Sequence, residues 1–135
     1  MREITRSVDP DLLARLLVRY GAGAFYILRL VFNEPTLAQP VCPHHEYIAA
    51  ELVHAVQQEL ACTITDVLAR RTRIAWSSCQ GLDLLSMMTD LLRRYAGLTA
   101  EQIDQQVDDY HRFLAAGLAY RNGTPSLRVL PTLHA

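Results

Sequence analysis

Apolar residues recur at every third or fourth position along most of this chain, which is the spacing of one face of an α-helix. Residues 99–122 are the clearest example: Thr99 and Gln102 have the capping-box pattern, and Asn122 and Gly123 mark the end. The apolar positions between them are Ile103, Val107, Tyr110, Phe113, Leu114 and Leu118. The periodicity predicts an all-α fold, a compact bundle of about five or six helices.

The same spacing predicts further helices over residues 10–20, 22–33, 46–60, 63–71 and 82–95. Asp9 and Pro10 are typical of an N-cap and a first helical position, and Gly97 is typical of the left-handed residue that closes a helix. Residues 22–33 are apolar almost all round, which favours a buried helix, although their aromatic and β-branched side chains would also suit a strand. We expect an irregular crossing over 34–45, because its three prolines lack amide donors.

Length and composition are those of one folded domain. Of the 135 residues, 50% are hydrophobic and 20% are charged, close to the average for globular proteins. No repeat or linker divides the chain, so we expect a single domain over 1–135, with its core at 9–122 and a C-terminal tail at 123–135. The longest apolar stretch, 22–32, is interrupted by Arg29 and is shorter than the roughly 20 residues of a membrane-spanning helix.

Charge excludes several kinds of function. The net charge of −1 lacks the surplus of cations that displaces phosphate counterions, so nucleic acid is not an expected partner. All 13 basic residues are arginine, which excludes a catalytic lysine. We expect no signal peptide, and we expect the three cysteines, Cys42, Cys62 and Cys79, to be reduced thiols of a cytoplasmic protein.

Cys42, His44, His45 and His54 gather in a short stretch and are of the residue types that bind zinc. Adjacent histidines with a single nearby cysteine do not have the spacing of a zinc motif, and a Cys/His nucleophile would need a base that nothing local supplies. We therefore expect surface histidines and no catalytic, cofactor-binding or metal site in this chain. A small Cys/His metal or redox protein is the alternative.

Charged residues at inward-facing helical positions are the most informative local feature. At about 100° per residue, Glu59 falls within the apolar sector of its helix and Glu51 falls at its edge. The next helix places Arg71 among apolar residues and Arg70 within i,i+4 reach of Asp66. We predict that Glu59 and Arg71 form a buried ion pair, with Glu51 as a further acceptor.

Thr63 is expected to cap this next helix, with Asp66 near its positive end. The structural interpretation of these charges is that they set the crossing of two helices. The functional alternative is that Arg70, Arg71 or Arg73 presents its guanidinium to a phosphate group or to a neighbouring domain.

The same stretch resembles a known family. The shared features are Ala50-Glu51-Leu52, Glu59, Ala61, Thr63, Asp66, Leu68 and Arg70-Arg71-Thr72-Arg73, after an opening at Val18-Arg19-Tyr20-Gly21-Ala22. These residues resemble the C-terminal domain of FAD-dependent glycerol-3-phosphate dehydrogenases and alpha-glycerophosphate oxidases. The similarity covers about residues 12–120, since the last helix with its Tyr110 also matches in position and character. It implies that the motif residues are Glu51, Glu59, Thr63, Asp66, Arg70 and Arg71.

In this family a larger N-terminal part binds FAD and substrate and oxidises glycerol 3-phosphate to dihydroxyacetone phosphate. The resemblance implies that this chain is a helical cap that packs on such a part and is inactive alone. Flavin binding by the chain itself is not expected, because Gly21 and Gly23 lie between predicted helices and no GxGxxG follows a strand.

The alternative function is a stand-alone helical protein-interaction or dimerisation module. An apolar surface that normally faces a catalytic part would also favour a homo-oligomer of the isolated domain. The resemblance is compatible with peripheral association of the parent enzyme with the cytoplasmic face of the membrane.

Overall fold

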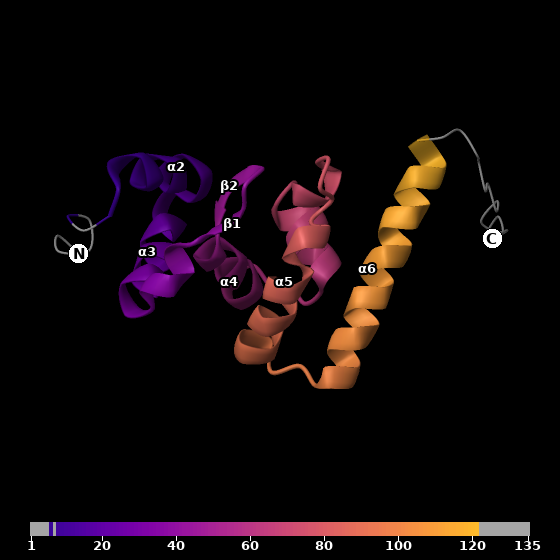
Figure 1. Ribbon diagram of the computed structural model, residues 1–135. Coiled ribbons are helices and arrows are strands. Elements are labelled where there is room, and N and C mark those ends of the chain that lie inside the picture. Colours follow the sequence, from indigo (N-terminus) through magenta and orange to yellow (C-terminus); the bar gives the residue numbers. More distant parts are fainter. Residues whose placement is uncertain (1–5, 7, 122–135) are drawn as a thin grey trace, which may run out of the picture.

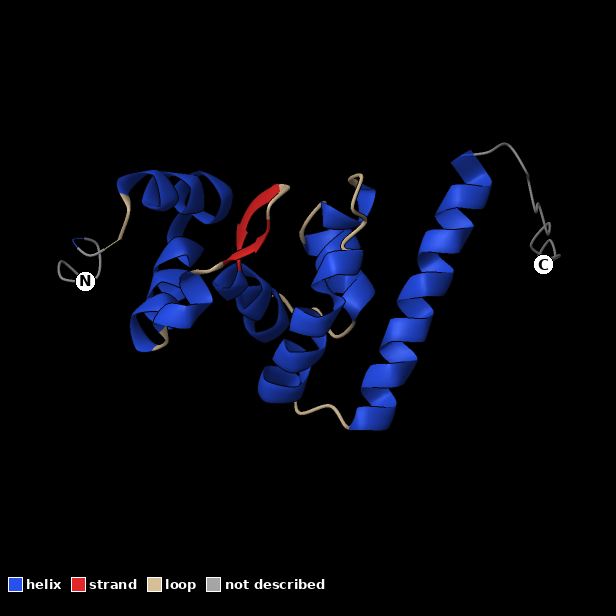
Figure 2. Ribbon diagram, viewed as in Figure 1, coloured by secondary structure: helices blue, strands red, loops and turns tan. Residues whose placement is uncertain are grey.

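Helices account for most of the residues that the computed structural model describes, which are residue 6 and residues 8–121 (Figure 1). The described α-helices are α2 (Pro10–Tyr20), α3 (Ala24–Asn33), α4 (Ala49–Gln58), α5 (Leu85–Leu91) and α6 (Ala100–Arg121). Strands β1 (Pro40–Cys42) and β2 (His45–Ile48) form one small hairpin between α3 and α4 (Figure 2). The predicted all-α class is confirmed for this part of the chain, and residues 22–33 are helical. The expected tail at 123–135 lies outside the described residues.

Helix boundaries follow the capping signals in the sequence. The Asp9 side chain accepts the N–H of Asp11 at the start of α2. Before α6, the Thr99 N–H donates to Gln102 Oε1 at 2.9 Å, and the Gln102 N–H donates to Thr99 Oγ1 at 3.2 Å. The predicted capping box is therefore present. Gly97 adopts φ +67°, as expected for the residue that closes the preceding helical segment.

The connection between α3 and α4 differs from our prediction. The irregular crossing predicted over 34–45 contains β1 and the start of β2, and the helix that follows begins at Ala49 rather than at Glu46. The strands pair antiparallel with Cys42 opposite His45. The prolines do not prevent this pairing: Pro35 lies before β1 in a short 3₁₀ helix, Pro40 is the first residue of β1, and Pro43 lies in the turn, where no ladder hydrogen bond is needed.

Two helical segments are wound more widely than an α-helix. The helix predicted over 63–71 becomes a π-helix at Asp66–Arg71, and α5 continues as a π-helix at Leu92–Ala96. A π-helix joins each carbonyl to the N–H five residues later. Accordingly, Thr72 donates its N–H to the carbonyl of Val67 at 2.9 Å. The wider turn changes which side chains face the core.

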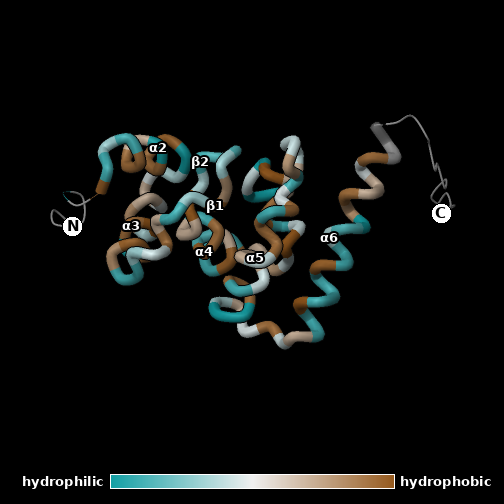
Figure 3. The backbone as a smooth tube through the Cα atoms, viewed as in Figure 1, coloured by the Kyte–Doolittle hydropathy of each residue, from teal (hydrophilic) through white to brown (hydrophobic). Residues whose placement is uncertain are grey.

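The core lies where α3, α4, α5 and the π-helix at Asp66–Arg71 meet, and α6 covers one side of it (Figure 1). Its largest fully buried side chains include Leu16, Ile27, Leu52, Ile64, Leu68, Leu84, Met88, Leu92 and Tyr110. Figure 3 shows hydrophobic positions recurring at helical spacing along α6. The Tyr110 hydroxyl donates to the Gln80 carbonyl, which attaches α6 to the turn that follows residue 76.

None of the described helices combines the length and the apolarity needed to cross a bilayer. The longest, α6, has 22 residues, and most of its described side chains are exposed.

Candidate functional site

Glu51 is the buried acid among the motif residues. It lies in the first turn of α4 and is 1% exposed. Its Oε2 accepts the N–H of Ile48 at 2.8 Å, which is one half of a capping box; isoleucine has no side-chain acceptor to supply the other half. Its Oε1 accepts a hydrogen bond from Nη1 of Arg19. The carboxylate therefore ties the end of α2 to the start of α4.

Arg19 is the partner of Glu51 that the sequence pattern did not predict. Its guanidinium also lies over the Tyr47 ring, 4.2 Å from the ring centroid. Burial lowers the pKa of Arg19, but the Glu51 carboxylate more than offsets this, and the pKa is raised overall. Burial, reinforced by the charge of Glu51, raises the pKa of Tyr20. Arg19 therefore stays charged and Tyr20 stays neutral around this carboxylate.

The predicted Glu59–Arg71 ion pair is wrong. Glu59 is the half-buried C-cap residue of α4, and Arg71 is exposed. The ion pairs recorded among the described residues do not include one between them. Of the two acids considered, the more deeply buried one is Glu51, and it binds Arg19 instead.

The π-helix at Asp66–Arg71 explains this error. Our projection assumed an α-helix, in which the fourth residue after buried Val67 would also turn inward. In a π-helix the fifth residue takes that place, and it is Thr72. Thr72 is 3% exposed, and its hydroxyl donates to the Val67 carbonyl at 2.9 Å. Arg71 is consequently directed to the surface.

Thr63, Asp66 and Arg70 form a local helix cap. Thr63 Oγ1 accepts the N–H of Asp66 at 2.9 Å, and Asp66 Oδ2 accepts the N–H of Cys62 at 3.2 Å. The predicted i,i+4 ion pair between Asp66 and Arg70 is present. Burial would raise the pKa of Asp66, but the hydrogen bonds and the Arg70 charge lower it below its usual value. These residues stabilise the start of the π-helix.

Arg71 and Arg73 flank the buried Thr72, and both are exposed. Within residues 8–121 the structure records no ion pair from either guanidinium. Buried Thr72 between them directs both side chains to the surface. Exposed guanidinium groups are suited to bind an external carboxylate or phosphate.

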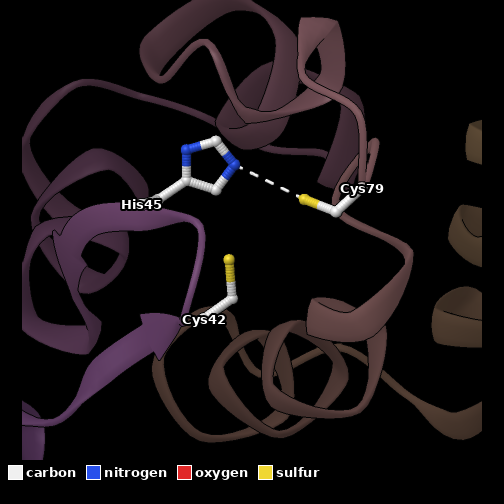
Figure 4. A group of neighbouring side chains, drawn as sticks. All are labelled: Cys42, His45 and Cys79. Carbon is white, nitrogen blue, oxygen red and sulfur yellow. Dashed lines mark hydrogen bonds between the residues drawn. The ribbon is translucent and has the colours of Figure 1, made fainter.

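A second group of reactive side chains gathers where the hairpin meets the turn after residue 76 (Figure 4). Cys42 ends β1, His45 begins β2, and Cys79 comes from the turn. One donor atom of each lies within 4.8 Å of the other two, and His45 Nε2 is 3.4 Å from Cys79 Sγ. Of the four residues considered from the sequence, the structure brings Cys42 and His45 together and leaves His44 exposed. Cys79 was missed because it is 34 residues beyond His45 and no local spacing signals it.

His54 lies apart from that group, packed against the rings of Tyr20 and Tyr26. It is 7% exposed, and its Nδ1 is buried without a hydrogen-bond partner in the described part of the chain. Burial lowers the pKa of His54, although the charges of Glu59 and Glu51 act in the opposite direction. The fold therefore favours the neutral imidazole. The predicted surface position of His54 is wrong, because α4 turns this residue toward α2 and α3.

The described residues do not fit a flavin dinucleotide. The phosphate-binding turn of a dinucleotide fold joins a strand to a helix within a parallel sheet, whereas the strands described here form an antiparallel hairpin. Gly21 and Gly23 lie in a 3₁₀ turn between two helices. No flavin chemistry is assigned to these residues.

Comparison with known proteins supports the family resemblance. A family model described as the C-terminal domain of alpha-glycerophosphate oxidase matches residues 2–103. A glycerol-3-phosphate dehydrogenase of Synechocystis sp. is 38% identical over 100 residues, which are 73% of this chain and 18% of that protein. One from Mycobacterium leprae is 32% identical over 107 residues, 78% of this chain and 18% of that protein. The mitochondrial enzyme of Mus musculus is 24% identical over 125 residues, 89% of this chain and 17% of that protein.

No solved structure matches the chain. The chain spans 18% of the length of the Synechocystis and Mycobacterium leprae relatives. The family match includes α2 to α5 and all the motif residues, and it ends shortly after the start of α6. The chain belongs to the family of the C-terminal domain of alpha-glycerophosphate oxidase.

Proposed function

We propose that the chain is the C-terminal accessory domain of an FAD-dependent glycerol-3-phosphate dehydrogenase, an enzyme that oxidises glycerol 3-phosphate to dihydroxyacetone phosphate. A larger N-terminal part holds flavin and substrate, and this domain packs on it as a helical cap without redox residues of its own. We place the parent enzyme in the cytoplasm. The observation that carries the proposal is the family match over residues 2–103, together with the 18% of its relatives' length that the chain covers.

Arg71 and Arg73 are the residues that we assign to contact with the catalytic part. Both are exposed, and Trp76, three residues after Arg73 in the chain, is 55% exposed. The Trp76 indole is held in place: its Nε1 donates to the Ala69 carbonyl at 3.2 Å, and its ring packs edge-on against Phe113. Arginine and tryptophan are the residues most enriched at the energetic centres of protein interfaces. This composition supports a docking surface here.

The accessory role is tested by complementation. The Synechocystis glycerol-3-phosphate dehydrogenase is prepared without the region that matches this chain, and the present domain is added as a separate protein. We expect a complex by gel filtration, a higher melting temperature of the flavin-bearing part, and recovery of glycerol-3-phosphate-dependent reduction of an artificial electron acceptor. The relative's own C-terminal region serves as the positive control. The proposal is wrong if that region restores activity but this chain neither binds the flavin-bearing part nor raises its melting temperature.

The docking surface is tested with charge reversals in the same assay. Arg71→Glu and Arg73→Glu should each weaken the complex at least about tenfold, as expected for an interfacial arginine, and leave the melting temperature of the isolated domain unchanged. Arg93→Glu is the matched control, because Arg93 is exposed on another segment, where it pairs with the nearby Asp90. Unchanged binding by both variants would remove the assignment of this surface while leaving the accessory role to the first experiment.

A further inference from the structure

Cys42, His45 and Cys79 meet although they come from three separate segments of the chain (Figure 4). Cys42 is 6% exposed, and the other two residues are half-buried. The hairpin itself sets two of the positions, because Cys42 and His45 are partners in its register. Cys79 is positioned by Ser77, whose hydroxyl donates to the Ile74 carbonyl at 2.6 Å and lies 3.3 Å from Cys79 Sγ. The hairpin and the turn after residue 76 therefore bring the three donor atoms together.

The spacing of these atoms suits a four-coordinate metal ion. With Zn–S near 2.3 Å and Zn–N near 2.0 Å, a tetrahedral site separates its donor atoms by about 3.5–3.8 Å. His45 Nε2 and Cys79 Sγ are 3.4 Å apart, and all three donor atoms lie within 4.8 Å of one another. Small side-chain rotations would bring the more widely separated donor atoms to the spacing of a tetrahedral site. We propose that Cys42, His45 and Cys79 bind a thiophilic transition-metal ion of the Zn²⁺ class, a property beyond the accessory role.

Binding of Zn²⁺ to the three ligands balances in charge and in protons. The two thiols each lose a proton as their sulfurs bind, so one Zn²⁺ displaces two protons and the resulting cluster of Zn²⁺ and two thiolates is neutral. A neutral cluster avoids the large cost of burying an isolated charge beside Cys42. His45 contributes Nε2 of a neutral imidazole; in the structure this nitrogen is hydrogen-bonded to the Ser77 hydroxyl at 2.9 Å. The metal–nitrogen bond would replace that hydrogen bond, with the imidazole proton carried on Nδ1, so the ring itself releases no proton. Water or another small ligand would complete the fourth position, as in zinc sites with three protein ligands.

Metal binding at this place would connect distant parts of the fold. Cys79 is followed directly by Gln80, whose carbonyl accepts the Tyr110 hydroxyl of α6. An ion held by Cys42, His45 and Cys79 would therefore join the hairpin, the turn and, through Tyr110, the last helix. An ion that binds only the folded state raises the free energy of unfolding by RT ln(1 + c/Kd), where c is the free ion concentration, so stability grows with that concentration. The site is thus a structural clamp that depends on reduced thiols.

The test uses the full chain, purified without a tag under reducing conditions. Zn²⁺ is titrated in competition with a chromophoric chelator, and Co²⁺ is bound as a spectroscopic probe. We expect one ion per chain, release of two protons, a thiolate-to-cobalt charge-transfer band with intense tetrahedral d–d bands, and a melting temperature that rises with Zn²⁺. Cys79→Ser and His45→Ala should each weaken Zn²⁺ binding at least about 100-fold, because even outer-shell changes at metal sites cost about 10–100-fold.

The chain offers a matched control for each ligand. Cys62 is an exposed cysteine, and His44 is the exposed neighbour of His45. Cys62→Ser and His44→Ala should retain the affinity of the unmodified chain within about twofold, since neither is a ligand. Circular dichroism and thermal melting in the presence of a chelator check that Cys79→Ser and His45→Ala are folded.

Several results would overturn the proposal. One is the absence of stoichiometric Zn²⁺ binding by the reduced chain. Another is a Co²⁺ spectrum without thiolate charge transfer, and a third is affinity that survives both Cys79→Ser and His45→Ala. A Cys42–Cys79 disulfide in the oxidised protein, with no metal binding after its reduction, would assign the two sulfurs to redox chemistry instead. All of these readouts are independent of the catalytic part, so they do not depend on the accessory role.

Discussion

Glu51 has two roles at one position. Its carboxylate caps α4 through the Ile48 N–H, and it also neutralises Arg19, whose side chain is 31% exposed. A carboxylate that is 1% exposed requires such partners, because an unpaired buried charge is costly. Glu59, the C-cap residue of α4, has neither role: it follows the last turn of the helix, where a negative charge opposes the helix dipole.

Glu51→Ala should destabilise the domain by about 2–3 kcal/mol, since it leaves the Ile48 N–H and the Arg19 guanidinium without their acceptor. Urea unfolding followed by circular dichroism measures the change. Glu59→Ala is the control, and it should change the free energy of unfolding by less than about 0.5 kcal/mol, as is usual for a residue without such contacts. A larger effect of Glu59→Ala than of Glu51→Ala would contradict the contacts described here.

At the scale of the element, the turn before α5 is closely packed. Gly81 adopts φ +69° and is buried against three neighbours. A Cβ at this position would lie 3.0 Å from Leu68 Cδ1, 3.1 Å from Ile74 Cγ2 and 3.2 Å from the Tyr110 hydroxyl oxygen. Gly97, at φ +67°, has nothing within 4 Å of its added Cβ. The two glycines therefore separate the cost of backbone conformation from the cost of crowding.

Gly97→Ala should cost about 1–2 kcal/mol, which is the penalty of a left-handed conformation for a residue with a Cβ. Gly81→Ala should cost about 1–3 kcal/mol more, because the added carbon also overpacks the junction of the π-helix, the turn and α6. Chemical denaturation of both variants gives the difference directly. Equal losses would mean that the three neighbours move aside without cost.

At the scale of the whole molecule, a few contacts between distant segments hold the helices in place. Arg19 binds Glu51, Tyr110 binds the Gln80 carbonyl, and Glu34 accepts hydrogen bonds from both Arg94 and Tyr95. The last of these joins the end of α3 to the π-helix after α5. Folding changes the pKa of some titratable side chains, including His54 and Asp66, so the free energy of unfolding depends on pH.

Global stability should fall as the solution is acidified below pH 6.5, the ordinary pKa of a histidine such as His54. Burial lowers the pKa of His54 in the folded state, so the unfolded chain takes up a proton first and the stabilising contribution is lost as pH falls through the folded pKa. Asp66 has the same sign at lower pH, because its pKa is also lowered by folding.

The measurement is the free energy of unfolding between about pH 7 and pH 5 in the presence of a chelator. His54→Phe removes the titrating group and should flatten the curve, whereas His111→Gln, at an exposed position of α6, should leave the slope unchanged. If the free energy of unfolding of His54→Phe falls with pH as steeply as that of the unmodified chain, another group causes the loss of stability in acid.

The local features of this protein were accessible from its sequence. The periodicity and caps of α2 and α6, the closure at Gly97 and the Asp66–Arg70 pair each depend on residues within a few positions of one another. The side chains and the backbone they bind are adjacent in the chain, so local spacing is sufficient to predict them. The family resemblance was also visible, because most of its shared residues fall within the single stretch 50–73.

Tertiary structure alone decided which residues meet across the fold. Arg19 lies 32 positions before Glu51, and His45 lies 34 positions before Cys79. Such contacts depend on how the intervening chain turns, and the β1–β2 hairpin and the π-helix at Asp66–Arg71 both differ from the regular elements that spacing suggested. A π-helix or a short hairpin is selected by packing against the rest of the core, since neither is strongly preferred by local sequence. The direction of Arg71, and the meeting of two thiols with an imidazole, follow from that packing.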